Sequence, residues 1–158
     1  DGDVQVAVDA IRAAAASHLF PSLTREGAPA ILETTGNPDG HLVLRGGAAG
    51  PNHDAESCAR AAALLEAGGL EPTIVIDASH GNSGKDPRRQ PDVVRDVAAR
   101  RRAGERALRG VMLESNLVEG RQDGAGRTPD ELVRGQSITD ACLGFDDTVA
   151  LLSEIARS

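Results

Sequence analysis

A group of reactive side chains directly follows a short apolar segment near the middle of the chain. Residues 73–76 are all β-branched, and an uninterrupted run of this kind is typical of a strand in a parallel sheet. Ligands bind where such strands end in α/β proteins. The side chains found there can bind protons, a metal ion or phosphate, and they are Asp77, Ser79, His80, Asn82 and Lys85. This stretch therefore predicts one part of a functional site.

An earlier predicted strand, residues 41–44, is followed by Arg45 and two glycines. Arginine donates a planar fork of hydrogen bonds that suits phosphate or carboxylate, and glycine lets a ligand approach the backbone. We expect Arg45 to bind an anionic substrate. The alternative is an ordinary surface arginine before a glycine turn.

Two carboxylates could complete a metal site with His80. Glu114 ends a predicted strand over residues 107–114, and Asp140 lies in the loop that follows it. One imidazole and two carboxylates suit a divalent ion such as Mn²⁺ or Fe²⁺. The alternatives are a structural histidine and an aspartate that caps a turn. We do not expect ligands at the other histidines, which are His18, His41 and His53.

These residues must be positioned by helices and strands that the sequence pattern also predicts. The strand centres lie near positions 43, 75 and 111, and these spacings fit successive βα units. A first helix begins after Asp3, a β-hairpin spans residues 18–33, and Asp146 or Asp147 is expected to cap the last helix. The expected fold is α/β, namely the carboxyl-terminal part of a (β/α)₈ TIM barrel with three βα units, an amino-terminal helix and an inserted hairpin.

Composition excludes several classes of protein. The net charge of −7 and the presence of two phenylalanines without tyrosine or tryptophan argue against a nucleic-acid binder. No apolar run is long enough to span a membrane. Cys58 and Cys142 form no CxxC pair, so a reduced, cytoplasmic setting is expected. The chain begins without methionine, and a helix precedes any strand, so we expect residues 1–158 to be the later part of one larger barrel domain.

Long, ordered motifs give the chain a resemblance to a known family. Segments 44–47, 76–83, 110–120 and 135–142 resemble type I 3-deoxy-D-arabino-heptulosonate 7-phosphate (DAHP) synthases. The resemblance implies a cytoplasmic transferase that condenses phosphoenolpyruvate with erythrose 4-phosphate, the first step of the shikimate pathway toward chorismate and the aromatic amino acids. It also implies a homo-oligomer when complete.

The resemblance further implies roles for individual residues. His80, Glu114 and Asp140 match three of the family's four metal ligands, for an ion of the Mn²⁺, Fe²⁺ or Co²⁺ class, and Arg45 matches an arginine that binds the phosphate of phosphoenolpyruvate. His80 and Asp140 are the expected catalytic residues. The fourth ligand is a cysteine of an early strand, and neither cysteine of this chain matches it.

The hairpin resembles the family's feedback-inhibition element, where an aromatic amino acid binds, and Phe20, Ser22 and Leu32 match positions in that pocket. Because much of the site belongs to the expected amino-terminal half, we expect the isolated chain to be inactive. The alternatives are a non-catalytic half-barrel that serves regulation or assembly, and another metal-dependent barrel lyase or aldolase.

Overall fold

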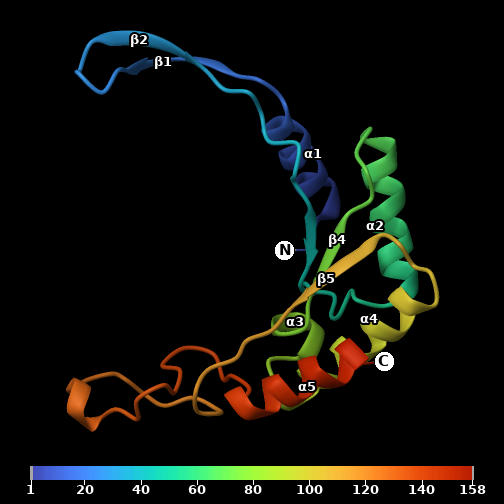
Figure 1. Cartoon of the computed structure of the whole chain (residues 1–158), viewed down its shortest axis with the longest axis vertical. Helices are drawn as coiled ribbons and strands as arrows, with labels where there is room; N and C mark the ends of the chain where they lie inside the picture. Colours follow the sequence, from blue (N-terminus) through green and yellow to red (C-terminus); the bar gives the residue numbers. More distant parts are fainter. Residues whose placement is uncertain (1, 158) are drawn as a thin grey trace.

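The computed structural model describes residues 2–157, apart from the side chain at position 157. Helices and strands alternate along much of the chain, which confirms the predicted α/β class, and Figure 1 shows them in chain order. The strands are β1 (Leu19–Leu23), β2 (Pro29–Glu33), β3 (Leu42–Leu44), β4 (Ile74–Asp77) and β5 (Leu108–Met112). The longer helices are α1 (Val4–Ala15), α2 (Ala55–Ala67), α4 (Gln90–Arg102) and α5 (Phe145–Arg157). The short helices are α3 (His80–Ser83), η1 (Pro87–Arg89) and η2 (Pro129–Glu131).

Helix starts follow from local capping. The side chain of Asp3 accepts hydrogen bonds from the backbone N–H groups of Gln5 and Val6, which confirms it as the cap of α1. Asp54 accepts from the N–H of Ser57 in the same way at the start of α2. Each cap satisfies donors that the first helical turn leaves without partners.

The core lies between one face of a parallel sheet and the helices beside it. The sheet has the strand order β3-β4-β5, and its register aligns Leu42 with Ile74 and Ile74 with Leu108. All three of these side chains are almost completely buried. They pack with apolar residues of the helices, which include Val8, Cys58, Ala61, Leu65, Val93, Val94, Val97 and Leu151.

The opposite face of the same sheet is open. Val43 and Met112 point to that side and are 37% and 47% exposed, respectively. In Figure 1, α2, α4 and α5 lie on one side of the strands, and the concave side of the molecule faces away from them. Within the described residues, β3 and β5 each pair with β4 alone, so both edges of this sheet are free. The chain thus contains a parallel sheet with one covered face.

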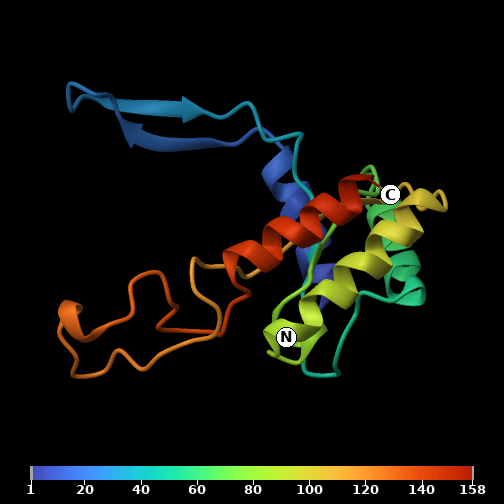
Figure 2. The same cartoon turned by 60° about the horizontal axis from the view of Figure 1, so that its bottom comes forward.

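Two segments project from this body, as Figure 2 shows. One is the hairpin expected at residues 18–33, in which β1 and β2 form an antiparallel pair. The other is a lobe over residues 117–141 that contains η2 and folds back on itself. No helix within residues 2–157 combines the length and apolar character that a membrane span requires.

The structure corrects three local predictions. Helix α5 begins at Phe145, so Asp146 and Asp147 lie in its first turn, where they favourably face the helix dipole, and do not cap it. Strand β5 ends at Met112, so Glu114 lies two residues beyond its end. His80 begins the short helix α3, whereas the sequence predicted only a loop there.

Candidate functional site

Three side chains that the sequence singled out as metal ligands lie together. His80, Glu114 and Asp140 each offer a ligand atom, and these atoms all lie within 4.8 Å of one another. The Nε2 atom of His80 is 3.2 Å from Oε1 of Glu114. The side chains of His80, Glu114 and Asp140 are 23%, 29% and 45% exposed, so a small molecule can reach all three.

Residues at and just after the end of β4 contact one edge of the His80 ring. Its Nδ1 atom lies 2.8 Å from Oδ2 of Asp77 and 2.7 Å from the hydroxyl oxygen of Ser79. The backbone of His80 has a φ of 49°, which is uncommon for a residue other than glycine. Because the ring's Nδ1 edge is occupied, its Nε2 edge is the one that faces Glu114.

Backbone hydrogen bonds bring the two carboxylates together. Gln90, which is 1% exposed, accepts from the N–H of Glu114 through its side-chain oxygen at 2.9 Å. Leu143 donates its N–H to the carbonyl of Glu114, and Asn116 donates to the carbonyl of Leu143. The chain after Asp140 therefore runs back alongside the residues after β5, which returns Asp140 to the site.

The donor set of this cluster fits a divalent cation. Two carboxylates this close repel each other unless a positive charge lies between them. Among the described residues, Lys85 is the one lysine or arginine that forms an ion pair with the cluster, at 3.8 Å from Asp140. An imidazole nitrogen together with carboxylate oxygens is the ligand chemistry of ions such as Mn²⁺ and Fe²⁺.

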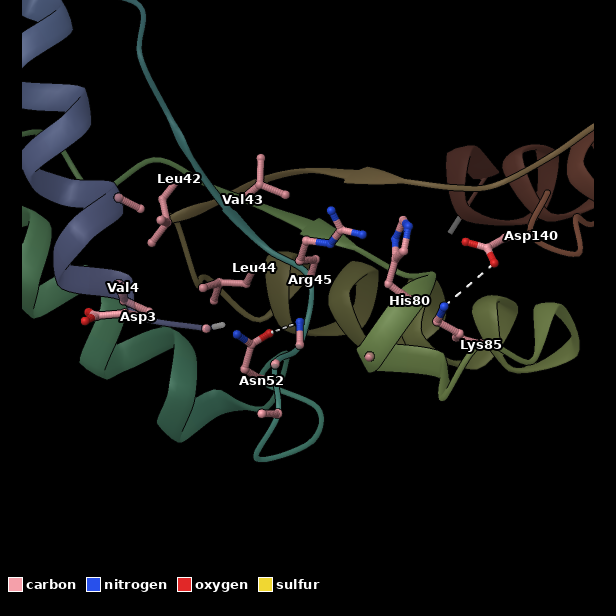
Figure 3. Close-up of a pocket in the computed structure, with 16 residues that line it drawn as sticks. Asp3, Val4, Leu42, Val43, Leu44, Arg45, Asn52, His80, Lys85 and Asp140 are labelled. Atoms are coloured by element: carbon pink, nitrogen blue, oxygen red, sulfur yellow. Dashed lines mark hydrogen bonds and ion pairs between the residues drawn. The ribbon is translucent and has the colours of Figure 1, made fainter.

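A pocket of about 630 Å³ opens beside the cluster (Figure 3). Arg45, His80, Lys85 and Asp140 line it, together with the glycines after β3. The Arg45 side chain is exposed, and no other described residue forms a hydrogen bond or ion pair with its guanidinium group. The pocket can therefore offer two positive side chains to an anion that lies next to the metal ligands.

The backbone places Arg45 close to His80. The N–H of Gly81 donates to the carbonyl of Arg45 at 3.0 Å, so the loop after β3 touches the start of α3. The amide of Asn82 donates to the carbonyls of Leu44 and Asp77, at 3.0 and 2.8 Å. One buried asparagine thereby ties the ends of two neighbouring strands together.

The hairpin residues lie apart from this site (Figure 1). Phe20 pairs with Leu32 across the two strands, and Ser22 lies two residues from Phe20. Side chains two residues apart point to the same face of a strand, so Phe20, Ser22 and Leu32 share one face. Phe20 and Leu32 are 43% and 42% exposed, which leaves this face accessible.

The remaining histidines of the described residues are not members of this cluster. The Nε2 atom of His18 lies 2.6 Å from the carbonyl of Ala13, and Nδ1 of His53 lies 3.8 Å from a carboxylate oxygen of Asp96. His41 is exposed immediately before β3.

Neither cysteine belongs to the cluster. Cys58 is buried between helices, where Arg100 donates to its sulfur, and burial raises the pKa of this thiol. Cys142 follows Asp140 by two residues, and burial also raises its pKa. Both thiols are therefore held in the protonated form, which is a poor metal ligand.

Sequence reasoning missed several residues that support the site. The contact between Asp77 and the His80 ring was not predicted, although Asp77 was noted as part of the polar stretch. Lys85 gave a signal, since it is the only lysine in the chain, but its pairing with Asp140 was not predicted. Gln90 gave no signal, because a glutamine near a helix start is ordinary.

Comparisons with known proteins show which sequences the chain resembles. The sequence model of a family described as the DAHP synthetase I family matches residues 2–153. A Trp-sensitive phospho-2-dehydro-3-deoxyheptonate aldolase from Enterobacter agglomerans is 49% identical over 158 residues, which cover 100% of this chain and 44% of the relative. A Tyr-sensitive enzyme of the same name from Escherichia coli K12 is 45% identical over 155 residues, or 98% of this chain and 43% of the relative.

A solved structure is similar as well. It is described as phospho-2-dehydro-3-deoxyheptonate aldolase from Francisella tularensis SCHU S4, and it superposes with a TM-score of 0.88 at 44% identity. The superposition covers 99% of this chain and 45% of that chain. The chain therefore spans less than half the length of the proteins it matches.

Proposed function

Because the chain belongs to the DAHP synthetase I family, we propose that it forms the carboxyl-terminal part of a DAHP synthase. The complete enzyme would condense phosphoenolpyruvate with erythrose 4-phosphate, releasing phosphate. The observation that carries this proposal is the cluster of His80, Glu114 and Asp140 beside the pocket that Arg45 lines. Both substrates carry phosphate, and the site combines a cation-binding set with two positive side chains, Arg45 and Lys85.

The described residues suit particular roles in this reaction. A divalent ion bound by His80, Glu114 and Asp140 would supply Lewis-acid polarisation of the aldehyde carbonyl. Arg45 would bind the phosphate of phosphoenolpyruvate through its guanidinium fork. The carbon–carbon bond forms from C3 of phosphoenolpyruvate, water adds at C2, and phosphate leaves with cleavage of its bond to C2. His80 would also orient that water, and Asp140 would accept a hydrogen bond from the aldehyde's hydroxyl group.

We propose that the remaining part of a (β/α)₈ barrel covers the open face of the sheet. Two observations support this arrangement: the free edges of β3 and β5, and the exposure of Val43 and Met112 on the face opposite the helices. Unpaired strand edges and exposed apolar side chains both favour association with further strands. The isolated chain would then lack the fourth metal ligand and part of the phosphate contacts, and it would be inactive.

The test compares single variants of the longest natural polypeptide that contains residues 1–158. His80→Ala and Glu114→Ala should abolish Mn²⁺-dependent formation of DAHP, measured as loss of phosphoenolpyruvate absorbance. His41→Ala provides a matched control, because His41 is exposed and outside the pocket. Full activity of either ligand variant contradicts the assignment. Formation of DAHP by the 158-residue chain alone contradicts the proposed need for further strands.

We also propose that the hairpin binds an aromatic amino acid as a feedback inhibitor. The shared, accessible face of Phe20, Ser22 and Leu32 supports this, as do the names of the Trp-sensitive and Tyr-sensitive relatives. Phe20→Ala should relieve inhibition by the cognate amino acid without loss of activity. Ile31→Ala is the matched control, since Ile31 is exposed on the opposite face of β2. Equal relief by both variants contradicts a site on the Phe20 face.

We further propose a homo-oligomer for the complete enzyme.

A further inference from the structure

Asp77 is a buried carboxylate that binds no expected substrate or metal ion, yet it contacts the centre of the site. It is 4% exposed at the end of β4. Its Oδ1 atom accepts hydrogen bonds from the N–H and the hydroxyl of Ser79, at 2.9 and 2.5 Å. Its Oδ2 atom lies 2.8 Å from Nδ1 of His80. A buried carboxylate must have its oxygens satisfied, and the partners of Asp77 include the imidazole ring.

The hydrogen-bond pattern determines which nitrogen of His80 carries the proton. The short distance between the Ser79 hydroxyl and Oδ1 of Asp77 requires a proton between them, and an ionised carboxylate cannot provide it. The single hydroxyl proton of Ser79 is therefore directed to Asp77, and a lone pair of the same oxygen faces Nδ1 of His80. Both neighbours of Nδ1 are thus acceptors, so Nδ1 carries a hydrogen. In the neutral ring, the lone pair then lies on Nε2, on the side of Glu114.

We propose that Asp77, assisted by Ser79, is a positioning residue that fixes His80 in the Nδ1–H tautomer and directs the Nε2 lone pair into the metal centre. This inference rests on the metal site of the proposed function. Metal-bound histidines commonly donate their other N–H to a carboxylate, which fixes the ring and increases its basicity as a ligand. His80 also has a φ of 49°, which is uncommon for a residue other than glycine.

Asp77→Asn tests the tautomer with little change of shape. The N–H and hydroxyl of Ser79 both need an acceptor, so the amide oxygen of the asparagine would take the place of Oδ1. Its NH₂ group would then face Nδ1 of His80 and donate to it. The proton of the neutral ring would move to Nε2, where it blocks metal binding.

The matched control is Asp86→Asn. Asp86 accepts from the N–H of the residue two positions later, Arg88, just as Asp77 accepts from that of Ser79. It is not a member of the metal cluster and has no hydrogen bond to His80 in the described structure. Both variants therefore replace an aspartate in the same kind of local turn, but only Asp77 contacts the ligand histidine.

The experiment measures Mn²⁺ affinity and the His80 tautomer in the longest natural polypeptide that contains residues 1–158. Calorimetry should show affinity about 10–100-fold weaker for Asp77→Asn than for the parent protein, and little change for Asp86→Asn. Nitrogen-15 NMR of the metal-free protein, at a pH where the ring is neutral, should show Nδ1–H in the parent and Nε2–H in Asp77→Asn. His80→Ala identifies the signal.

Three results would overturn the inference. An Nε2–H tautomer in the parent protein does so without reference to any variant. Unchanged Mn²⁺ affinity in Asp77→Asn overturns it while leaving the metal centre intact. Absence of Mn²⁺ binding by the parent protein removes the metal centre itself, and this outcome contradicts the proposed function together with the inference.

Discussion

Replacement of Gly46 by alanine tests how closely the loop after β3 must approach α3. Gly46 has a φ of +76°, and a methyl group there would stand 2.7 Å from two backbone atoms of Gly81 and 2.9 Å from the nitrogen of Asn82. These are backbone atoms, so they cannot rotate away. The left-handed conformation costs alanine about 1–2 kcal/mol, and overpacking of this kind costs about 1–3 kcal/mol more. We therefore expect Gly46→Ala to lower the free energy of unfolding by about 2–5 kcal/mol.

Gly69 provides the matched control for this prediction. Its φ of +75° is almost the same, but a methyl group there would have no neighbour within 4 Å. Gly69→Ala should therefore lower the free energy of unfolding only by the cost of the left-handed backbone, about 1–2 kcal/mol. Urea denaturation followed by circular dichroism measures both variants. If Gly46→Ala loses no more stability than Gly69→Ala, the close approach does not constrain the folded state, and our account of how Arg45 is positioned is wrong.

Two further predictions concern buried and capping side chains. Asn82→Ala removes the donor to the carbonyls of Leu44 and Asp77, so we expect the free energy of unfolding, measured by urea denaturation, to fall by about 3 kcal/mol. A decrease of less than about 1 kcal/mol would contradict this expectation. Hydrogen bonds from Ser57 lower the pKa of Asp54 below its ordinary value of 3.8. The ionised cap therefore stabilises the folded protein fully at pH values above 3.8, and this stabilisation is lost as the pH falls through the lower pKa of the folded state. Asp54→Ala should thus lower the free energy of unfolding by about 1 kcal/mol at pH 7 and by less in acid. An equal loss at both pH values would contradict the assignment of Asp54 as the helix cap.

The elements that the sequence predicted well are those specified by neighbouring residues. Asp3 lies directly before the helix it caps, and the apolar face of α1 recurs at helical spacing. Strand β4 is marked by consecutive β-branched residues. The approach of Glu114 to His80 followed from a rule of the fold instead, since parallel neighbouring strands end on the same side of a sheet.

The features that sequence reasoning missed depend on contacts between distant residues. The α3 segment has a polar, glycine-containing composition that resembles a loop, and its N–H contact to Arg45 joins residues from different strand ends. Gln90 reaches the backbone of Glu114 across 24 positions of sequence. No local pattern identifies which polar side chain will meet a backbone group so far along the chain.

The ligand residues of the site are held by hydrogen bonds but remain exposed to water, and for this reason we expect further strands to close the site. Hydrogen bonds hold the ligand residues in place, through Asp77 for His80 and through Gln90 for Glu114. The ligand side chains nevertheless remain 23–45% exposed, and the sheet face beside them is open. Water at such a surface weakens the attraction between opposite charges severalfold relative to a protein interior. We therefore expect the chain to set the directions of its ligands, and we expect strong binding of a charged substrate to require further strands that exclude water from the open face.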